Sequence, residues 1–354
     1  MAQAEEQRPA SGWAHKTAHV PDPQLLSAQI LETVSRRRRL LRRLGAVASV
    51  GIIAASATIF VRTLMHIDVA HFKAALAATN DNQIVLAFLF AALSYLALTG
   101  YDGLALRHLR ITIPYRLTAA ASFASYAASF TLGFPLLTGG AIRYWVYAPA
   151  GLTAGNIASL TVVAGITFWL GLGLIVGAGF LIAPGAVSEI DHLHPLANDL
   201  IGFGLLGALA AYIGWIGYMR TRGGAVIANF RLPGLTTTLG QTALGVIDIC
   251  AASATLYVLL PSETAIGFPT FAIVYSVAAM LGIASHSPGG LGVFEATILQ
   301  AVGGDYDALL VSLLLFRGIY YLVPFVCALA LLGGLETVRR WRAFRQSIAA
   351  PARD

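Results

Sequence analysis

Four ionisable side chains lie well inside apolar stretches of this sequence: Arg143, Asp248, Glu295 and Arg317. An ionised group near the centre of a membrane helix costs at least ~2.5 kcal/mol on insertion scales, so these four should face the protein interior or water. They could pair with one another and hold a helix bundle together. They could also line a polar cavity in which the arginines bind phosphate through their planar guanidinium groups. Because intramembrane charges are usually functional, we favour the cavity, and the two roles can coexist.

Glu295 follows a turn of small residues inside a stretch without charge. The 31 residues from Thr264 to Phe294 contain no Asp, Glu, Lys or Arg, yet they include the sequence Ser-Pro-Gly-Gly. Proline and glycine break a helix, and broken backbone at membrane depth must be buried in protein or line a watery cavity. The turn therefore adds five candidate binding residues, His286, Ser287, Pro288, Gly289 and Gly290.

The helix that should begin near Gly290 would offer free N–H groups and a positive dipole end to an anion. His286 could titrate near neutral pH, although a lone histidine beside such a turn is more often a hydrogen-bonding structural residue.

A second broken stretch precedes Arg143. Residues 133–144 contain a proline and a Gly-Gly pair before the charge, which resembles the order in the first stretch. Transporters built from inverted repeats place discontinuous helices at corresponding points of two halves, and chance in a chain with 36 glycines is the alternative. Gly139, Gly140 and Tyr144 join the candidate binding residues, as does Tyr320, although such aromatics commonly pack at the membrane interface.

The composition requires a membrane to solvate these elements. The chain is 57% hydrophobic and 11% charged, and several uncharged runs reach the ~20 residues that span a bilayer. We expect an all-α, polytopic integral membrane helix bundle with about eight spans plus two broken or re-entrant segments. The expected spans are 44–61, 84–101, 156–182, 200–219, 239–260, 266–285 and 308–335, with a broken segment at 117–142 and a half-helix at 290–302.

Local signals refine two of these elements. Asn80-Asp81-Asn82 is typical of a helix start, and Arg317 and Pro324 could bend the last span. Loop charges then set the orientation, because basic loops stay in the cytoplasm. Both termini should be cytoplasmic, with a basic tail at 1–43, a single transmembrane domain at 44–337 and a second basic tail at 338–354. Membrane orientation explains the arginine runs better than nucleic-acid binding does.

The sequence contains no recognisable catalytic or cofactor motif. HExxH, Walker A, Gly-x-Ser-x-Gly and CxxC are all absent, and no metal-ligand spacing emerges. We therefore expect no enzyme activity, no cofactor and no metal site. Transport without a nucleotide site would be uniport, exchange or ion-coupled.

Three motifs in fixed order resemble a known family. They are Gly-Gly-Ala-Ile-Arg-Tyr-Trp-Val-Tyr at 139–147, Ser-Pro-Gly-Gly-Leu-Gly-Val-Phe-Glu at 287–295, and Phe-Arg-Gly-Ile-Tyr-Tyr-Leu-Val-Pro at 316–324. This pattern resembles the lysylphosphatidylglycerol synthase transmembrane-region family, which includes the flippase domain of the multiple peptide resistance factor. The resemblance covers about 40–338 and implies a bacterial inner-membrane protein that moves aminoacylated phosphatidylglycerol to the outer leaflet. The chain stops at Asp354, so we expect it to lack the soluble aminoacyltransferase domain of the full-length factor.

A lipid flippase or transporter is thus the leading hypothesis. Arg143 and Arg317 would bind the phosphate, while Glu295 and Asp248 would bind an amino group or stay paired. One alternative is an intramembrane lipid-modifying enzyme that uses Glu295 and His286 as acid and base. Another is a non-transporting partner of a separate lipid synthase. The expected partners are membrane phospholipids and no nucleic acid, and a homo-oligomer is left open.

Overall fold

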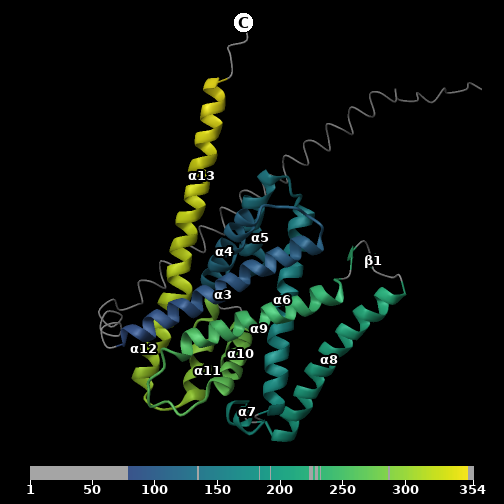
Figure 1. The fold of residues 1–354 in the computed structure, drawn as a ribbon. Coiled ribbons are helices and arrows are strands. Elements are labelled where there is room, and N and C mark those ends of the chain that lie inside the picture. Colours follow the sequence, from purple (N-terminus) through teal and green to yellow (C-terminus); the bar gives the residue numbers. More distant parts are fainter. Residues whose placement is uncertain are drawn as a thin grey trace, which may run out of the picture. The chain divides into compact units, whose positions relative to one another are not determined.

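The computed structural model describes residues 79–133, 135–182, 184–191, 193–222, 226–227, 230–231, 233–285 and 288–349. These residues form helices and one antiparallel pairing of two short strands (Figure 1). The expectation of an all-helical membrane protein is confirmed in this part of the chain. The expected first span, the N-terminal basic tail, His286 and Ser287 lie outside the described residues.

Figure 1 labels these elements in chain order. The α-helices are α3 (Asp81–His108), α4 (Tyr115–Leu132), α5 (Pro135–Tyr147), α6 (Ala154–Ile182), α7 (Pro184–Asp191), α8 (Pro195–Thr221), α9 (Leu235–Tyr257), α10 (Phe268–Ala284), α11 (Val293–Val302), α12 (Tyr306–Phe316) and α13 (Val323–Ala349). Two 3₁₀ turns, η1 (Ala148–Ala150) and η2 (Pro288–Gly290), and a π-helical segment, η3 (Arg317–Leu322), connect some of them. Strand β1 (Val226–Ile227) pairs with β2 (Phe230–Arg231) between α8 and α9.

Five of the described segments are long and apolar enough to cross a membrane. They are α3, α6, α8, α9 and the continuous run Tyr306–Trp341. Helix α10 has 17 residues and α11 has 10. At ~1.5 Å per residue, α11 reaches only about half-way through a ~30 Å hydrocarbon core, as expected for the half-helix after the Pro-Gly-Gly turn. The expected total of about eight spans and the inverted repeat are not confirmed.

The broken segment at 117–142 folds as a hairpin of two short helices, α4 and α5. Gly133 adopts a positive φ of 80° and ends α4, and α5 returns along it. The Tyr147 hydroxyl, at the end of α5, lies 3.5 Å from the Thr118 carbonyl oxygen near the start of α4. The sequence therefore predicted this break correctly, and with it the return of the chain.

The last span is one continuous helical run with a π-helical turn at Arg317–Leu322. Pro324 has no N–H and cannot donate to the carbonyl of Tyr320, four residues earlier. The Tyr95 hydroxyl of α3 donates to that carbonyl at 3.1 Å. The Thr131 hydroxyl of α4 donates to the next carbonyl, that of Tyr321, at 3.3 Å. The irregular turn therefore has backbone acceptors satisfied by side chains of two other helices, which fixes its position in the bundle.

Helix α9 packs between α3 and α6 (Figure 1). At its crossing with α6, a Cβ on Gly245 would lie 2.5 Å from the Thr167 carbonyl oxygen, so only glycine fits. The Gln241 amide donates to the Thr167 hydroxyl at 3.0 Å beside this crossing. Close approach at small residues, reinforced by side-chain hydrogen bonds, is how membrane helices pack where the hydrophobic effect does not drive them together.

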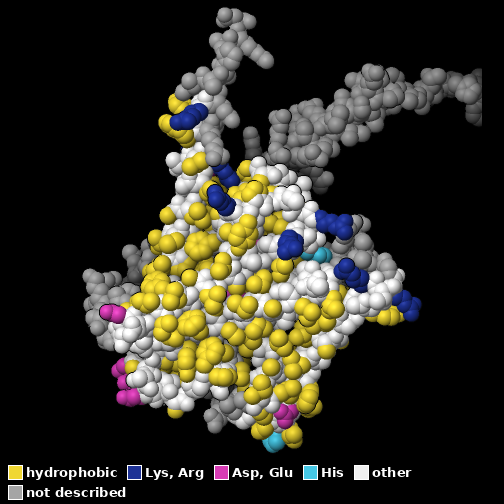
Figure 2. All heavy atoms as spheres, viewed as in Figure 1, with side chains coloured by type: hydrophobic (Ala, Val, Ile, Leu, Met, Phe, Trp, Pro, Cys, Tyr) yellow, Lys and Arg dark blue, Asp and Glu magenta, His cyan; other side chains and the backbone are white. Residues whose placement is uncertain are grey.

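Charged side chains mark the ends of the spanning helices. Helix α3 begins with Asp81 and ends with Arg107, α8 has Asp199 near its start and Arg220 in its last turn, and the last span starts after Asp305. Acidic N-terminal and basic C-terminal turns also complement the helix dipole. Figure 2 shows the Lys and Arg side chains towards one end of this face, the Asp and Glu side chains towards the other, and mostly hydrophobic side chains between.

Candidate functional site

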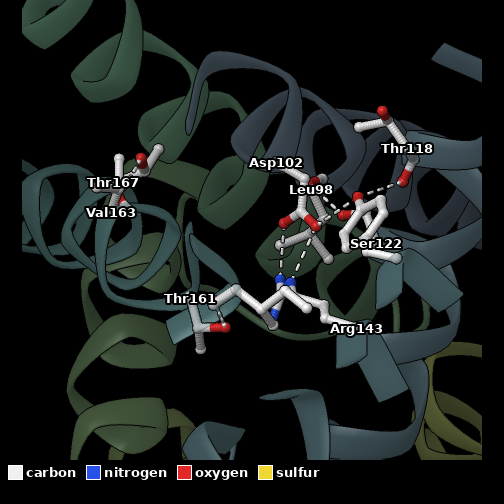
Figure 3. Close-up of polar contacts among 10 residues, drawn as sticks. Leu98, Asp102, Thr118, Ser122, Arg143, Thr161, Val163 and Thr167 are labelled. Carbon is white, nitrogen blue, oxygen red and sulfur yellow. Dashed lines mark hydrogen bonds and ion pairs between the residues drawn. The ribbon is translucent and has the colours of Figure 1, made fainter. Parts of the chain in front are cut away.

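The first buried ion pair joins α5 to α3. Arg143 donates from Nε to Asp102 Oδ2 at 2.9 Å and from Nη2 to Asp102 Oδ1 at 2.7 Å (Figure 3). The Tyr147 hydroxyl donates to the same carboxylate at 3.2 Å. The Arg143 and Asp102 side chains are 3% and 0% exposed. This bidentate geometry is the strongest form of the interaction, and it leaves the carboxylate well satisfied away from solvent.

Helix α4 packs against this pair. The Arg143 guanidinium carbon lies 4.9 Å from the centre of the Tyr126 ring, and Ser122 Oγ donates to the Leu98 carbonyl at 2.8 Å (Figure 3). Gly139, one helical turn before Arg143, makes the close packing possible, because a Cβ there would lie 2.8 Å from Ser129 Oγ.

Asp102 was not among the charged residues that we expected inside the membrane. The expected second span ended one residue earlier, at Tyr101, whereas α3 continues to His108. Apolar residues at 104–106 follow the aspartate, which is the signal that could have extended the span and placed the carboxylate inside it. Arg143 is therefore paired with a residue outside the set of four intramembrane charges that we expected.

The second ion pair lies at the broken helix. Arg317 Nε donates to Glu295 Oε1 at 2.7 Å, and Nη2 lies against the same oxygen. Glu295 Oε2 accepts the backbone N–H of Gly292 at 2.8 Å, and Arg317 Nη1 donates to the Gly289 carbonyl at 2.6 Å. The pair thus connects the start of α11, the η2 turn and the π-helical η3. Its side chains are 12% and 20% exposed, so it is more open than the first pair.

The η2 turn also contacts the end of α4, close to the other break. Gly289 has a φ of +60°, a left-handed conformation, and a Cβ on it would lie 3.0 Å from the Phe130 carbonyl oxygen. A side chain here would combine backbone strain with a collision, which explains the glycine. The first Pro/Gly stretch therefore packs against the last turn of α4, the helix that ends at the second stretch.

The remaining buried charge, Asp248 of α9, has no ion pair among the described residues. Its Oδ1 accepts from Ser94 Oγ at 2.5 Å and its Oδ2 accepts from the Tyr101 hydroxyl at 2.8 Å. Ser94 Oγ also lies 2.7 Å from the Tyr320 hydroxyl, and either atom could be the donor. Asp248 is 3% exposed. A carboxylate held only by hydroxyl groups differs chemically from the two held by arginine.

Aromatic rings connect these centres. Phe294, Phe316 and Tyr320 stack in succession, with centroid separations of 5.9 and 5.2 Å, and Phe130 also stacks on Tyr320 at 5.9 Å. The Arg317 guanidinium carbon lies 4.4 Å from the centre of the Tyr321 ring. The stack packs α11, α12, η3 and α4 around the second ion pair.

The other expected site residues have simpler surroundings. Tyr144 is 43% exposed and Tyr320 is 3% exposed, so the two tyrosines we grouped differ sharply. A Cβ on Gly140 would meet no atom within 4 Å, whereas one on Gly290 would lie 3.2 Å from Gly282 Cα of α10. Pro288 begins the η2 turn.

The chemistry available here is charge recognition and proton binding. Among the described residues, no group of three or more His, Cys, Asp or Glu side chains could hold a metal ion. Two arginines and three carboxylates are arranged as two ion pairs and one hydroxyl-bound acid. Charge-assisted pairs of this type can exchange partners with a phosphate or an amine, because those groups present the same charges and the same hydrogen-bonding atoms.

Comparison with known proteins agrees with this architecture. The family model described as "Lysylphosphatidylglycerol synthase TM region" matches residues 46–328. The uncharacterised protein slr0712 of Synechocystis sp. is 35% identical over 73% of this chain and 81% of its own length. The inner membrane protein YbhN of Escherichia coli is 27% identical over 67% of this chain and 74% of its own length.

A longer relative matches only in part. The phosphatidylglycerol lysyltransferase of Staphylococcus haemolyticus is 24% identical over 84% of this chain. The matched region is 35% of the length of that lysyltransferase.

Proposed function

Because the chain belongs to the lysylphosphatidylglycerol synthase transmembrane-region family, we propose that it moves a phospholipid with a charged head group across the membrane. The kinship with a phosphatidylglycerol lysyltransferase supports a lipid derived from phosphatidylglycerol and bearing an amino group, such as an aminoacylated phosphatidylglycerol. Such a head group combines one negative phosphate with one or more positive amines. The site that receives it needs both signs of charge within a short distance.

The observation that supports this function best is the partly exposed pair of Arg317 and Glu295 at the broken helix. A guanidinium and a carboxylate in contact match a phosphate and an ammonium in contact. Arg317 would exchange Glu295 for the lipid phosphate, and Glu295 would then bind the amine. Each charge keeps a partner throughout, so the head group can cross without leaving a buried charge unpaired, which would be costly.

The backbone around this pair favours the same exchange. Helix α11 begins at Val293 and presents its N-terminus beside Glu295, which already accepts the Gly292 N–H. When Glu295 turns to an amine, that N–H becomes available to a phosphate oxygen, and the helix dipole favours the negative charge. Half-helices that end at midmembrane positions do the same in known transporters.

Arg143 takes a different part in the proposal. Its side chain is 3% exposed and already holds Asp102 with two hydrogen bonds. We assign it to a second phosphate contact that forms only after α5 moves away from α3. In the conformation described here, it locks the α4–α5 hairpin onto α3.

The proposed location is the bacterial inner membrane, with both termini in the cytoplasm. The acidic starts and basic ends of α3, α8 and the last span support one common direction for these helices. Because basic ends remain in the cytoplasm, the C-terminal end of α13 would lie there. Labelling of single cysteines at the two ends of α3 in intact cells tests the orientation.

A leaflet-resolved lipid assay in proteoliposomes tests the function. Glu295→Gln and Arg317→Ala should abolish movement of a labelled aminoacylated phosphatidylglycerol. The matched controls are Glu336→Gln and Arg340→Ala, which break an ion pair on α13 whose side chains are 38% and 81% exposed. Both controls should move lipid as the wild type does. Normal movement in the Glu295 and Arg317 variants would overturn the proposal.

The same preparation separates the alternatives. Wild-type protein that moves no lipid but co-purifies with a lipid synthase would favour a non-transporting partner. A lipid product detected by mass spectrometry after incubation with the purified protein would favour an enzyme.

A further inference from the structure

Asp248 is a buried acid that lipid recognition by the Arg317–Glu295 pair does not use. It lies on α9, and both of its carboxylate oxygens accept hydrogen bonds from hydroxyl groups of α3. Asp102 and Glu295, by contrast, are each bound to an arginine. The hydroxyl surroundings of Asp248 call for a separate explanation.

Hydroxyl partners suit both protonation states of an acid, whereas an arginine suits only the ionised state. A hydroxyl can donate or accept, but a guanidinium has donors alone. With Asp248 ionised, Ser94 donates to Oδ1 and can accept from the Tyr320 hydroxyl. With Asp248 protonated at Oδ1, the acid donates to Ser94, and Ser94 turns to donate to Tyr320. The hydrogen-bond count stays the same while the buried charge disappears.

The groups around Asp248 are nearly all uncharged. Five tyrosines from four elements lie within electrostatic range, namely the buried Tyr95, Tyr101, Tyr275 and Tyr320 and the half-buried Tyr126. Helix α6, which also packs on α9, has no titratable side chain. No described titratable side chain of α8 or α12 bonds to Asp248, and Arg143 and Arg317 hold other carboxylates. Nothing in the described surroundings fixes Asp248 in the ionised state.

The network also reaches both ion pairs. Tyr101, which donates to Asp248, directly precedes Asp102 on α3. Tyr320 belongs to the π-helical turn that begins with Arg317, and Tyr95 donates to its carbonyl. A change in the charge of Asp248 therefore acts on the two elements that hold the pairs. A π-helical turn is a frequent site of functional rearrangement in helices.

We propose that Asp248 is the proton-binding site that couples lipid movement to a transmembrane proton gradient. This inference rests on the proposed function and adds its energy source. In each cycle, one proton from the outer side adds to the Asp248 carboxylate, giving the neutral acid, and leaves it as a free proton towards the cytoplasm. The lipid moves in the opposite direction while the network rearranges.

Two measurements test this coupling. The first compares lipid movement in proteoliposomes with and without a pH gradient, and its readout is the ratio of the two rates within each variant. The wild type should show a ratio well above one, and Asp248→Asn should lose that dependence and give a ratio of one. A sodium gradient at constant pH should give a ratio of one in both. The proposal would be overturned if Asp248→Asn still gave a ratio above one with the pH gradient. It would also be overturned if the sodium gradient accelerated lipid movement in the wild type and not in Asp248→Asn.

The second measurement does not depend on lipid movement. Purified protein in weakly buffered detergent solution is acidified, and a pH electrode counts the protons bound per chain. Asp248→Asn should bind one proton fewer than the wild type, whereas equal counts would overturn the proposal even if the protein moves lipid. Should wild type move no lipid, the proposed function fails and this count still decides whether Asp248 binds a proton. Ser94→Ala provides a second variant, in which the same proton should bind at a shifted pH.

Discussion

Asp102 and Asp248 are both buried aspartates at contacts of α3, the first with α5 and the second with α9, yet they are held in opposite ways. Asp102 has two bonds from Arg143 and one from Tyr147. Asp248 has one bond from a serine and one from a tyrosine. A buried carboxylate that is bound by a guanidinium stays ionised, whereas one that is bound by hydroxyl groups can be protonated. The first is suited to fixing helices in place, and the second is suited to changing state.

Replacing each aspartate by asparagine should give the largest difference between the two sites in the free energy of unfolding. Asp102→Asn leaves Arg143 as an unpaired buried cation, and breaking such a pair from one side costs ~3–5 kcal/mol of the free energy of unfolding. Asp248→Asn removes a buried charge and keeps groups that can donate and accept, so it should change that free energy by less than ~1 kcal/mol. Thermal denaturation in detergent measures both. An equal loss of the free energy of unfolding in the two variants would show that the two aspartates do not differ in this way.

The Glu295–Arg317 ion pair should require the left-handed conformation of Gly289. Gly289→Ala places a Cβ at a φ of +60° and 3.0 Å from the Phe130 carbonyl, and it displaces the carbonyl that Arg317 binds. The left-handed conformation alone costs ~1–2 kcal/mol for a residue with a Cβ. Gly140→Ala is the control, since it meets no atom within 4 Å and lies inside helix α5.

There, exchanging glycine for alanine should stabilise the helix by ~0.5–1 kcal/mol. Denaturation midpoints in detergent compare the two variants. A Gly289→Ala protein as stable as Gly140→Ala would show that the η2 turn adapts freely.

The smallest expected effect concerns the hydroxyl groups around Asp248. Tyr101→Phe removes one hydrogen bond from the carboxylate and leaves the ring in place, at a cost of ~0.5–1.5 kcal/mol. Tyr306→Phe is the matched control, because Tyr306 is 60% exposed at the start of α12. Chemical denaturation in mixed micelles resolves differences of this size. A loss in Tyr101→Phe as large as in Asp102→Asn would mean that the hydroxyl network fixes the charge as firmly as an arginine does.

The sequence predicted the helical breaks well, because they are local. Proline and paired glycines interrupt a helix wherever they occur, so the hairpin at 133–135 and the short helix after Gly290 follow from residue types alone. Asn80 caps α3 as expected, accepting the Asn82 N–H at 3.0 Å. Arg317 and Pro324 also mark the irregular turn of the last span.

The partners of the charges were harder to predict, because they are distant in sequence. Ser94 is 154 residues from Asp248, and a single serine in an apolar helix does not differ from one that fills space. Asp102 is 41 residues from Arg143 and directly follows the expected second span, which ended at Tyr101. Only the packing of α3 against α9 and α5 brings these groups together. The expectation that the buried charges pair was sound for Glu295 and Arg317, and it does not extend to Asp248.

The most direct test of the contrast is infrared difference spectroscopy of the reconstituted protein, recorded between neutral and acidic pH. A protonated carboxyl group has a C=O stretching band that an ionised carboxylate lacks. We expect a band from a buried carboxyl group that appears on acidification in the wild type. This band should disappear in Asp248→Asn and persist in Asp102→Asn. A band that persists in Asp248→Asn and disappears in Asp102→Asn would contradict the assignment of the two aspartates.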